Sequence, residues 1–89
     1  DKSEVLAFPN PVAPDYNGVI AIKGLTANAN IKITNINGGL VYQTIANGGE
    51  AIWNGKNFSG EKVASGVYFV LSSNEDGSQK IVTKILFLN

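Results

Sequence analysis

The chain has 89 residues, with seven acidic and seven basic side chains and therefore a formal net charge of zero. Its lysines form no run, which argues against nucleic acid or an anionic membrane as main partner, because both need a concentrated positive field. No apolar run approaches the roughly 20 residues of a transmembrane helix, so no transmembrane segment is expected. Cysteine and histidine are absent, which excludes a disulfide framework, a cysteine nucleophile and the common zinc sites.

At this length we expect one domain over residues 1–89, with an entry linker and first strand over residues 1–7. Because the chain starts at Asp1 rather than Met, we expect a segment of a longer protein. So small a domain buries only about 60 to 65 per cent of its unfolded surface, and its stability depends on a few large side chains. The candidates for the core are Tyr16, Tyr42, Trp53, Tyr68 and the four phenylalanines.

Two-residue alternation and short β-branched runs extend along nearly the whole chain, and no window carries a helical stripe between caps. The expected strands cover residues 5–8, 18–23, 29–36, 40–46, 50–53, 67–73 and 79–88. Seven short strands with frequent turns predict an all-β fold, a two-sheet antiparallel sandwich.

Glycine-containing turns separate these strands. Asn37-Gly38-Gly39 and Asn47-Gly48-Gly49 supply positive-φ positions, which predicts a meander of the third, fourth and fifth strands. Asn74-Glu75-Asp76-Gly77 predicts a hairpin between the last two strands. Residues 54–65 lack alternation, and we expect them to carry the chain between the sheets with Phe58 and Val63 turned inwards.

The segment that follows the first strand is rich in proline. Pro9, Pro11 and Pro14 lack the N–H that a central strand must donate, which predicts an edge strand breaking into a stiff turn. We expect Phe8, directly before this turn, to insert into the core.

The remaining candidates for chemistry are weak. The acidic residues fall mainly in expected turns and strand ends, where solvated carboxylates are usual, and they are Asp1, Glu4, Asp15, Glu50, Glu61, Glu75 and Asp76. Residues 15–18 and 74–77 offer oxygen ligands for calcium, but ordinary turn chemistry explains both. Trp53, Tyr42 and Tyr68 form either a sugar-stacking platform or part of the core, and in a small domain we favour the core. We therefore expect no catalytic residue, no metal and no cofactor.

Five blocks of sequence, taken together and in order, are more specific. They are FPNPV (8–12), IKITNINGGLV (31–41), WNGKN (53–57), GEKVASGVY (60–68) and KIVTKIL (80–86). The series resembles the C-terminal sorting domain of the type IX (Por) secretion system of the Bacteroidetes lineage. The family motif residues that match are Phe8, Pro9, Asn10, Pro11, Gly38, Trp53, Gly55, Gly66, Val67 and Tyr68.

The resemblance implies a seven-stranded immunoglobulin-like sandwich at the end of an exported protein. It implies a non-catalytic sorting signal, which the outer-membrane export machinery recognises after the protein has entered the periplasm. It also implies a destination at the outer-membrane surface or outside the cell, where a surface sortase commonly removes the domain from its upstream cargo.

The last strand is apolar on both faces, which predicts a second contact surface. Positions 81, 85 and 87 can face the core, which leaves Leu86 and Leu88 on the opposite face with Lys84. An exposed edge also invites strand addition, by a transport component or by another copy of the domain. The residues we expect to be recognised are Lys80, Lys84, Ile85, Leu86, Phe87, Leu88 and Asn89.

Three other interpretations of the domain stay open at this point. Leu86 and Leu88 can instead rest against an upstream cargo domain. The domain can also be a retained structural or docking module, or a carbohydrate-binding module that uses the aromatic residues.

Overall fold

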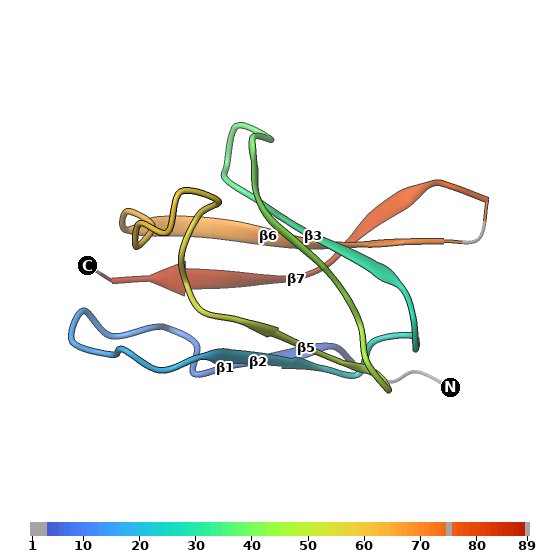
Figure 1. Ribbon diagram of the computed structural model, residues 1–89, viewed down its shortest axis with the longest axis horizontal. Coiled ribbons are helices and arrows are strands. Elements are labelled where there is room, and N and C mark those ends of the chain that lie inside the picture. The colour runs from blue at the N-terminus through green and yellow to red at the C-terminus, as the bar shows by residue number, and fades with distance from the viewer. Residues whose placement is uncertain (1–3, 75, 89) are drawn as a thin grey trace.

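The computed structural model describes residues 4–74 and 76–88, which form two packed β-sheets (Figure 1). In chain order the strands are β1 (Leu6–Phe8), β2 (Ile20–Lys23), β3 (Asn30–Thr34), β4 (Leu40–Ile45), β5 (Glu50–Trp53), β6 (Gly66–Ser73) and β7 (Gln79–Phe87). All seven lie within two residues of the expected bounds. Within the described ranges no helix is long and apolar enough to span a membrane.

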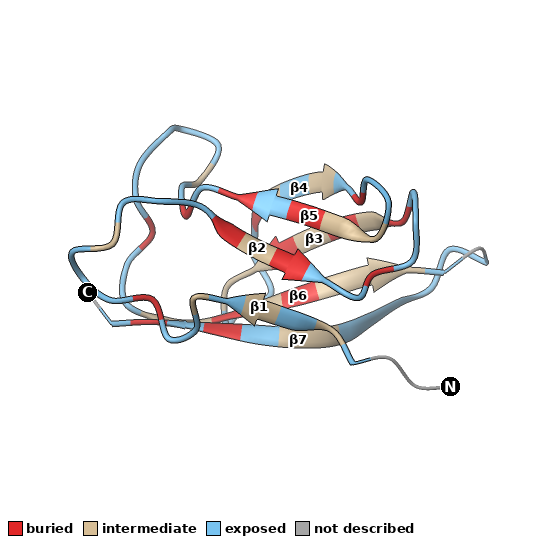
Figure 2. Cartoon of the chain, turned by 90° about the horizontal axis from the view of Figure 1, so that it is seen from below, coloured by how far each residue is buried: buried red, intermediate tan, exposed pale blue. Residues whose placement is uncertain are grey.

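One sheet has the strand order β1-β2-β5 and the other the order β4-β3-β6-β7. All paired strands are antiparallel, which confirms the expected two-sheet sandwich. Figure 2 shows β1 over β7 on one side of the sandwich and β5 beside β4 on the other. β1 is an edge strand, as the prolines after it predicted.

The predicted meander of the third, fourth and fifth strands is wrong. β3 does pair with β4, but β5 pairs with β2 in the other sheet. Gly48 and Gly49 have φ angles of 64° and 94°, and at this turn the chain leaves the four-stranded sheet for the three-stranded one. The backbone N–H of Leu25 then donates to the carbonyl of Gly49 at 2.9 Å and ties this turn to the other sheet.

Alternation along the strands builds the core between the sheets, where one residue in two points inwards. The largest fully buried side chain is that of Trp53, and its ring centroid lies 5.4 Å from that of Phe87 and 6.0 Å from that of Tyr68. After Trp53, the largest fully buried side chains are Phe87, Ile20, Ile22, Ile31, Ile33, Ile85, Val12 and Val70.

Two of the expected core aromatics lie on the surface. Phe8 is 46% exposed because Ala7 takes the inward position on the short strand β1, and Lys23 Nζ lies 5.6 Å from the Phe8 ring centroid. Phe58 is 65% exposed. It lies in a turn that Asn57 holds by accepting the backbone N–H groups of Ser59 and Glu61.

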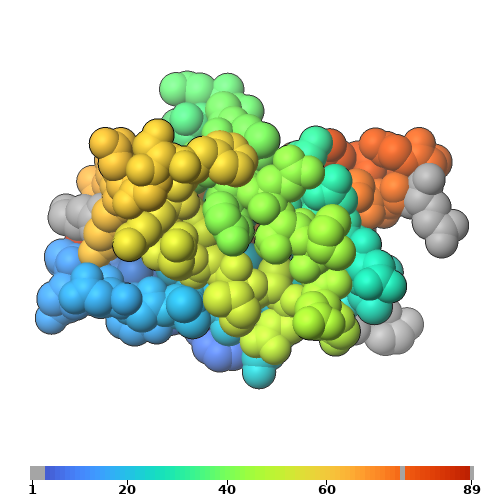
Figure 3. Space-filling view, in the orientation of Figure 1, coloured from blue at the N-terminus to red at the C-terminus, as the bar shows by residue number. Residues whose placement is uncertain are grey.

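The loop of residues 54–65 does connect the two sheets, as expected. Figure 3 shows it in yellow, next to green residues of the β3–β4 region, where the rings of Phe58 and Tyr42 lie 6.5 Å apart. Val63 is buried as predicted, and its N–H donates to the carbonyl of Gly55.

A β-bulge changes the faces of β7. Val70 of β6 pairs with Thr83, but the next residue, Leu71, pairs with Ile81, so Val82 is an extra residue on β7. The extra residue reverses the alternation, because side chains change faces at every residue. Ile81 is therefore 57% exposed, and the expectation that it faces the core is wrong. The half-buried Val82 packs against the core instead.

Candidate recognition surface at the terminal strand

The C-terminal half of β7 has a buried inner face. Ile85 and Phe87 are 0% and 1% exposed, which confirms the inward direction expected for both. The Phe87 ring meets the edges of Trp53 and Tyr68 in T-shaped contacts, with centroids 5.4 and 5.5 Å away. A folded domain cannot offer these two side chains to a partner, so they are anchors of the strand.

The outer edge of the same half is also occupied. The Asn10 side-chain amide donates to the carbonyl of Lys84 at 2.9 Å, and its oxygen accepts the N–H of Leu86 at 3.0 Å. Two residues further on, the backbone of Val12 donates to the carbonyl of Leu86 at 2.8 Å and accepts the N–H of Leu88 at 2.9 Å. Val12 itself is 1% exposed. Pro9 and Pro11 flank Asn10, so the motif residues of the first block form the cover of this edge.

Motif residues of the middle blocks surround the buried end of β7. Trp53 Nε1 donates to the carbonyl of Lys56 at 2.9 Å, which satisfies the one polar group of a fully buried ring. Gly55 has φ 76°, and a Cβ at this position would lie 3.4 Å from the Phe87 ring. Glycine is favoured here by its conformation, because a Cβ would make only an ordinary van der Waals contact with the ring.

Tyr68 contributes a second polar contact at the same end. Its ring is buried, as expected for a core residue, and its hydroxyl donates to the carbonyl of Ala64 at 2.6 Å. A tyrosine that bonds to the backbone a few residues upstream is typical of immunoglobulin-like sandwiches. Burial raises the pKa of the Tyr68 hydroxyl above its ordinary value.

The remaining motif residues lie at turns and on the outer face. Gly66 has φ 140° at the start of β6 and pairs with Phe87, and Val67 pairs with Leu86. Gly38 has φ 88° in the β3–β4 hairpin, far from β7 along the sheet, where its conformation makes the turn.

The outer face of β7 presents the side chains that the sequence analysis placed there. Lys84 is exposed, and Leu86 and Leu88 are 37% and 46% exposed. Lys80 is exposed beyond the bulge, at the hairpin end of the strand. Asn89, the last expected recognition residue, lies outside the described residues.

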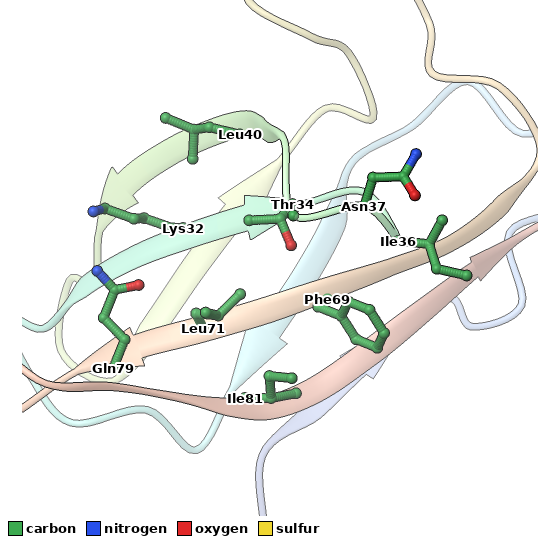
Figure 4. A pocket seen from close by; sticks show the side chains of 10 residues that line it. Lys32, Thr34, Ile36, Asn37, Leu40, Phe69, Leu71, Gln79 and Ile81 are labelled. Carbon is green, nitrogen blue, oxygen red and sulfur yellow. The ribbon is translucent and has the colours of Figure 1, made fainter.

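A shallow groove of about 550 Å³ crosses the outer face of the same four-stranded sheet. Figure 4 shows Phe69 and Leu71 of β6 between β3, which carries Lys32 and Thr34, and Ile81 of β7. The far wall is the β3–β4 hairpin, with Ile36 69% exposed and Leu40 44% exposed. This groove was not predicted from the sequence, although β6, like β7, carries apolar side chains on both of its faces.

The acidic side chains do not converge on a reaction centre. Among residues 4–74 and 76–88, no three His, Cys, Asp or Glu side chains lie close enough to hold a metal ion. Asp76 accepts hydrogen bonds from the Ser78 hydroxyl and the Ser78 N–H, which lower the pKa of the carboxyl group. This is turn chemistry of the hairpin, as expected for residues 74–77.

Comparison with known proteins agrees with this arrangement. The model of the family "Secretion system C-terminal sorting domain" matches residues 6–87. The chain belongs to this family. The sorting domain is a signal for type IX secretion, which carries proteins to the cell surface or the extracellular space.

A solved structure extends the comparison. It comes from a study of PorZ, described as an essential bacterial surface component of the type-IX secretion system of Porphyromonas gingivalis. The two chains are 35% identical with a TM-score of 0.83, over 96% of this chain and 11% of the other. Curated protein sequences contain no match. The sorting domain therefore corresponds to a small part of that longer chain.

Proposed function

We propose that the type IX export machinery recognises the folded sorting domain through the exposed side chains of Lys84 and Leu86 in β7 and of Leu88, which directly follows it. The observation that carries this proposal is the occupation of every other side of residues 84–88. The inner face is packed against Trp53 and Tyr68, and the free edge is bonded to Asn10 and Val12. Only the outer side chains remain for a partner.

The family motifs support this proposal by what they hold. The first block closes the edge of β7, and the WNG and SGVY blocks build the pocket for Phe87. Residues scattered over the whole chain thus fix the conformation of one five-residue segment. A recognition element gains affinity from such preorganisation, because less conformational entropy is lost on binding.

The finer roles belong to the same proposal. The domain is non-catalytic, follows an upstream cargo domain through the periplasm and is removed by a surface sortase after export. Lys80 serves as a secondary contact at the hairpin end of β7.

Export of a reporter tests the recognition surface. The domain is fused behind a signal peptide and a fluorescent cargo, with Lys84→Ala or Leu88→Ser introduced singly. Both variants are expected to keep their thermal midpoint, because the side chains are exposed, and to leave cargo in the periplasm. Ile52→Ser is the matched control, since Ile52 is 44% exposed on the outer face of the other sheet.

Normal export of both folded β7 variants would overturn the proposed surface. Loss of export in the Ile52→Ser control as well would point to a general effect of surface polarity and would equally count against the terminal strand.

A second candidate function is a retained docking module at the cell surface. The apolar groove on the outer face of the four-stranded sheet favours it, because the large apolar side chains of Ile36 and Ile81 are exposed there. Mass spectrometry of the full-length parent protein separates the two functions. Recovery of peptides from residues 4–88 at the surface supports retention, and their absence with a modified cargo terminus supports removal.

The third interpretation, a carbohydrate-binding module, loses two of its three aromatic residues, while Tyr42 is half-buried. Trp53 is 0% exposed and Tyr68 is 7% exposed, so neither ring offers a face to a sugar.

A further inference from the structure

The outer face of the four-stranded sheet carries an apolar row along its β6 strand. The outward positions of β6 are taken by Val67, Phe69 and Leu71, and all three side chains are half-buried. On the outer strands of the sheet, Leu40 and Ile81 are 44% and 57% exposed. Figure 4 shows Phe69 and Leu71 in the middle of this face, with β3 on one side and β7 on the other. Exposed apolar side chains gathered in this way mark a site of interaction.

The charges around the apolar row all have the same sign. The four strands of this sheet contain three lysines and no acidic residue. Lys32 of β3 pairs with Leu71 on one side of β6, and Lys84 of β7 pairs with Phe69 on the other side. Paired residues share a face of the sheet, so these two lysines flank the apolar row. The third lysine, Lys80, points to the opposite face.

The outer face of the three-stranded sheet is balanced in charge by comparison. Its strands contain one lysine and one acidic residue, and these two, Lys23 and Glu50, pair with each other. In the turn before β7, the carboxylate of Asp76 accepts hydrogen bonds from Ser78 and is occupied within the turn. The four-stranded sheet therefore combines apolar side chains with unbalanced positive charge. A surface that complements it carries carboxylates beside an apolar side chain.

We propose that this face binds an extended acidic segment of another protein, in which two carboxylates flank a large apolar side chain. The apolar side chain lies over Phe69 and Leu71, and the carboxylates pair with Lys32 and Lys84. Standard strand spacings place these two lysines about 12 Å apart, two strands across and two residues along. Residues i and i+4 of an extended segment lie about 13 Å apart on one face, with residue i+2 between them. The proposal rests on the proposed function only through Lys84, which both share.

Polar side chains at the margin of the groove can serve the backbone of the bound segment. Thr34, Asn37 and Gln79 line the groove around the apolar row (Figure 4). Among residues 4–74 and 76–88, none of these three side chains has a hydrogen-bond partner. The segment lies across the face of the sheet and not along a strand edge, so its binding adds no strand to the sheet.

NMR titration of the domain with the synthetic peptide acetyl-Thr-Glu-Thr-Leu-Thr-Glu-Thr-amide tests the proposal. Amide shifts are expected at Phe69, Leu71 and Ile81, and none at Ile52 on the outer face of the other sheet. Replacement of the two glutamates by glutamine should weaken binding about twofold to fivefold for each ion pair lost. Replacement of the leucine by serine should weaken it about tenfold, because the apolar contact is lost.

Three lysine variants locate the charges on the domain. Lys32→Gln and Lys84→Gln should each weaken binding of the glutamate peptide about twofold to fivefold, and added salt should reduce this difference from the unaltered domain. Lys23→Gln is the matched control, because Lys23 also lies on an outer face beside an aromatic ring, that of Phe8, but on the other sheet. It should bind the peptide as the unaltered domain does. The thermal midpoint of all three variants should be unchanged, since none of these side chains is buried.

Three results would overturn the proposal: no shifts at Phe69 and Leu71 at millimolar peptide, equal binding of the glutamine peptide, or unchanged binding by Lys32→Gln. Binding of the domain to phosphatidylglycerol vesicles without any response to the peptide would also overturn it and would assign the face to an anionic membrane surface. The export assay reports on the proposed function separately. Loss of export in Lys84→Ala together with unchanged peptide binding by Lys84→Gln would overturn the acidic segment and retain the export surface.

Discussion

The two halves of the terminal segment, residues 79–83 and 84–88, are held in place by different contacts. Residues 84–88 pack against Trp53 on their inner face. One edge is bonded to Asn10 and Val12, and the other edge pairs with β6. Residues 79–83 pair with β6 across a bulge, and Lys80 and Ile81 are exposed. Residues 84–88 are therefore held by contacts with residues distant in sequence, and residues 79–83 mainly by the β6–β7 hairpin.

This difference explains how residues 84–88 are held in place without a regular strand on their outer edge. Terminal residues are ordered when tertiary contacts hold them, whatever their position in the sequence. Local stability within one strand varies with its buried contacts, so the half with more of them should open last. The comparison can be tested by removing the support of either half.

The largest effect is expected from Phe87→Ala. The substitution empties the space between Trp53 and Tyr68 and should cost about 3 to 5 kcal/mol in the free energy of unfolding, a large share of the stability of a small domain. Chemical denaturation measures the loss. Ile81→Ala in the other half, at a side chain 57% exposed, should change stability by about 0.5 kcal/mol or less. Equal losses in the two variants would show that both halves are supported alike.

A smaller loss is expected from Gly55→Ala. The residue has φ 76°, which costs a side chain roughly 1 to 2 kcal/mol, and the new Cβ would lie 3.4 Å from the Phe87 ring. Gly60→Ala is a matched control with φ 81° and open space around the Cβ position, so it should show the conformational cost alone. The two variants should therefore lose similar amounts, and a much larger loss in the Gly55 variant would show that the Phe87 ring does not accept the added methyl group.

The strands and the inward side chains near the chain end could be predicted from sequence because alternation reports local geometry. Ile85, Phe87, Trp53 and Tyr68 all lie where the pattern placed them. The face of Ile81 could not be predicted, because a single inserted residue at Val82 reverses the alternation without leaving a mark such as glycine.

The local sequence patterns did not predict which strands pair with each other. The turn at Gly48 and Gly49 has the sequence of a hairpin but leads into the other sheet, since turn residues set the direction of the chain and not the strand that follows as partner. The contact of Asn10 with the edge of β7 was not predicted for the same reason. Proline restrictions predicted a break after Phe8, but only the fold brings Asn10 beside Lys84, 74 residues away.

A third test measures how Tyr68, which packs against Phe87, stabilises the domain at different pH values. Tyr68→Phe keeps the ring contacts but removes the hydroxyl bond to Ala64, which should cost about 1 kcal/mol. Burial raises the pKa of Tyr68 in the folded state, so its contribution is complete below the ordinary value of about 10 and is lost as pH rises through the raised pKa. Denaturation at pH 8 and pH 11 should therefore show a steeper alkaline loss in the unaltered domain than in Tyr68→Phe. Parallel losses would show that Tyr68 is not the titrating group.

The smallest effect is expected at the hairpin that begins the weaker half. Hydrogen bonds from the Ser78 hydroxyl and then the Ser78 N–H lower the pKa of Asp76, so their stabilisation is present above the ordinary carboxyl pKa and is lost as pH falls through the lowered value. Ser78→Ala removes the hydroxyl donor and should raise the Asp76 pKa part of the way back, because the backbone donor remains. NMR titration of the Asp76 carboxyl carbon measures the shift, with amide exchange at Leu86 recorded in the same samples. Exchange at Leu86 should stay unchanged, because its N–H donates to Asn10 and only the length of β7 connects it to the turn. A change at Leu86 that accompanies the Asp76 shift would show that the two halves of β7 open together.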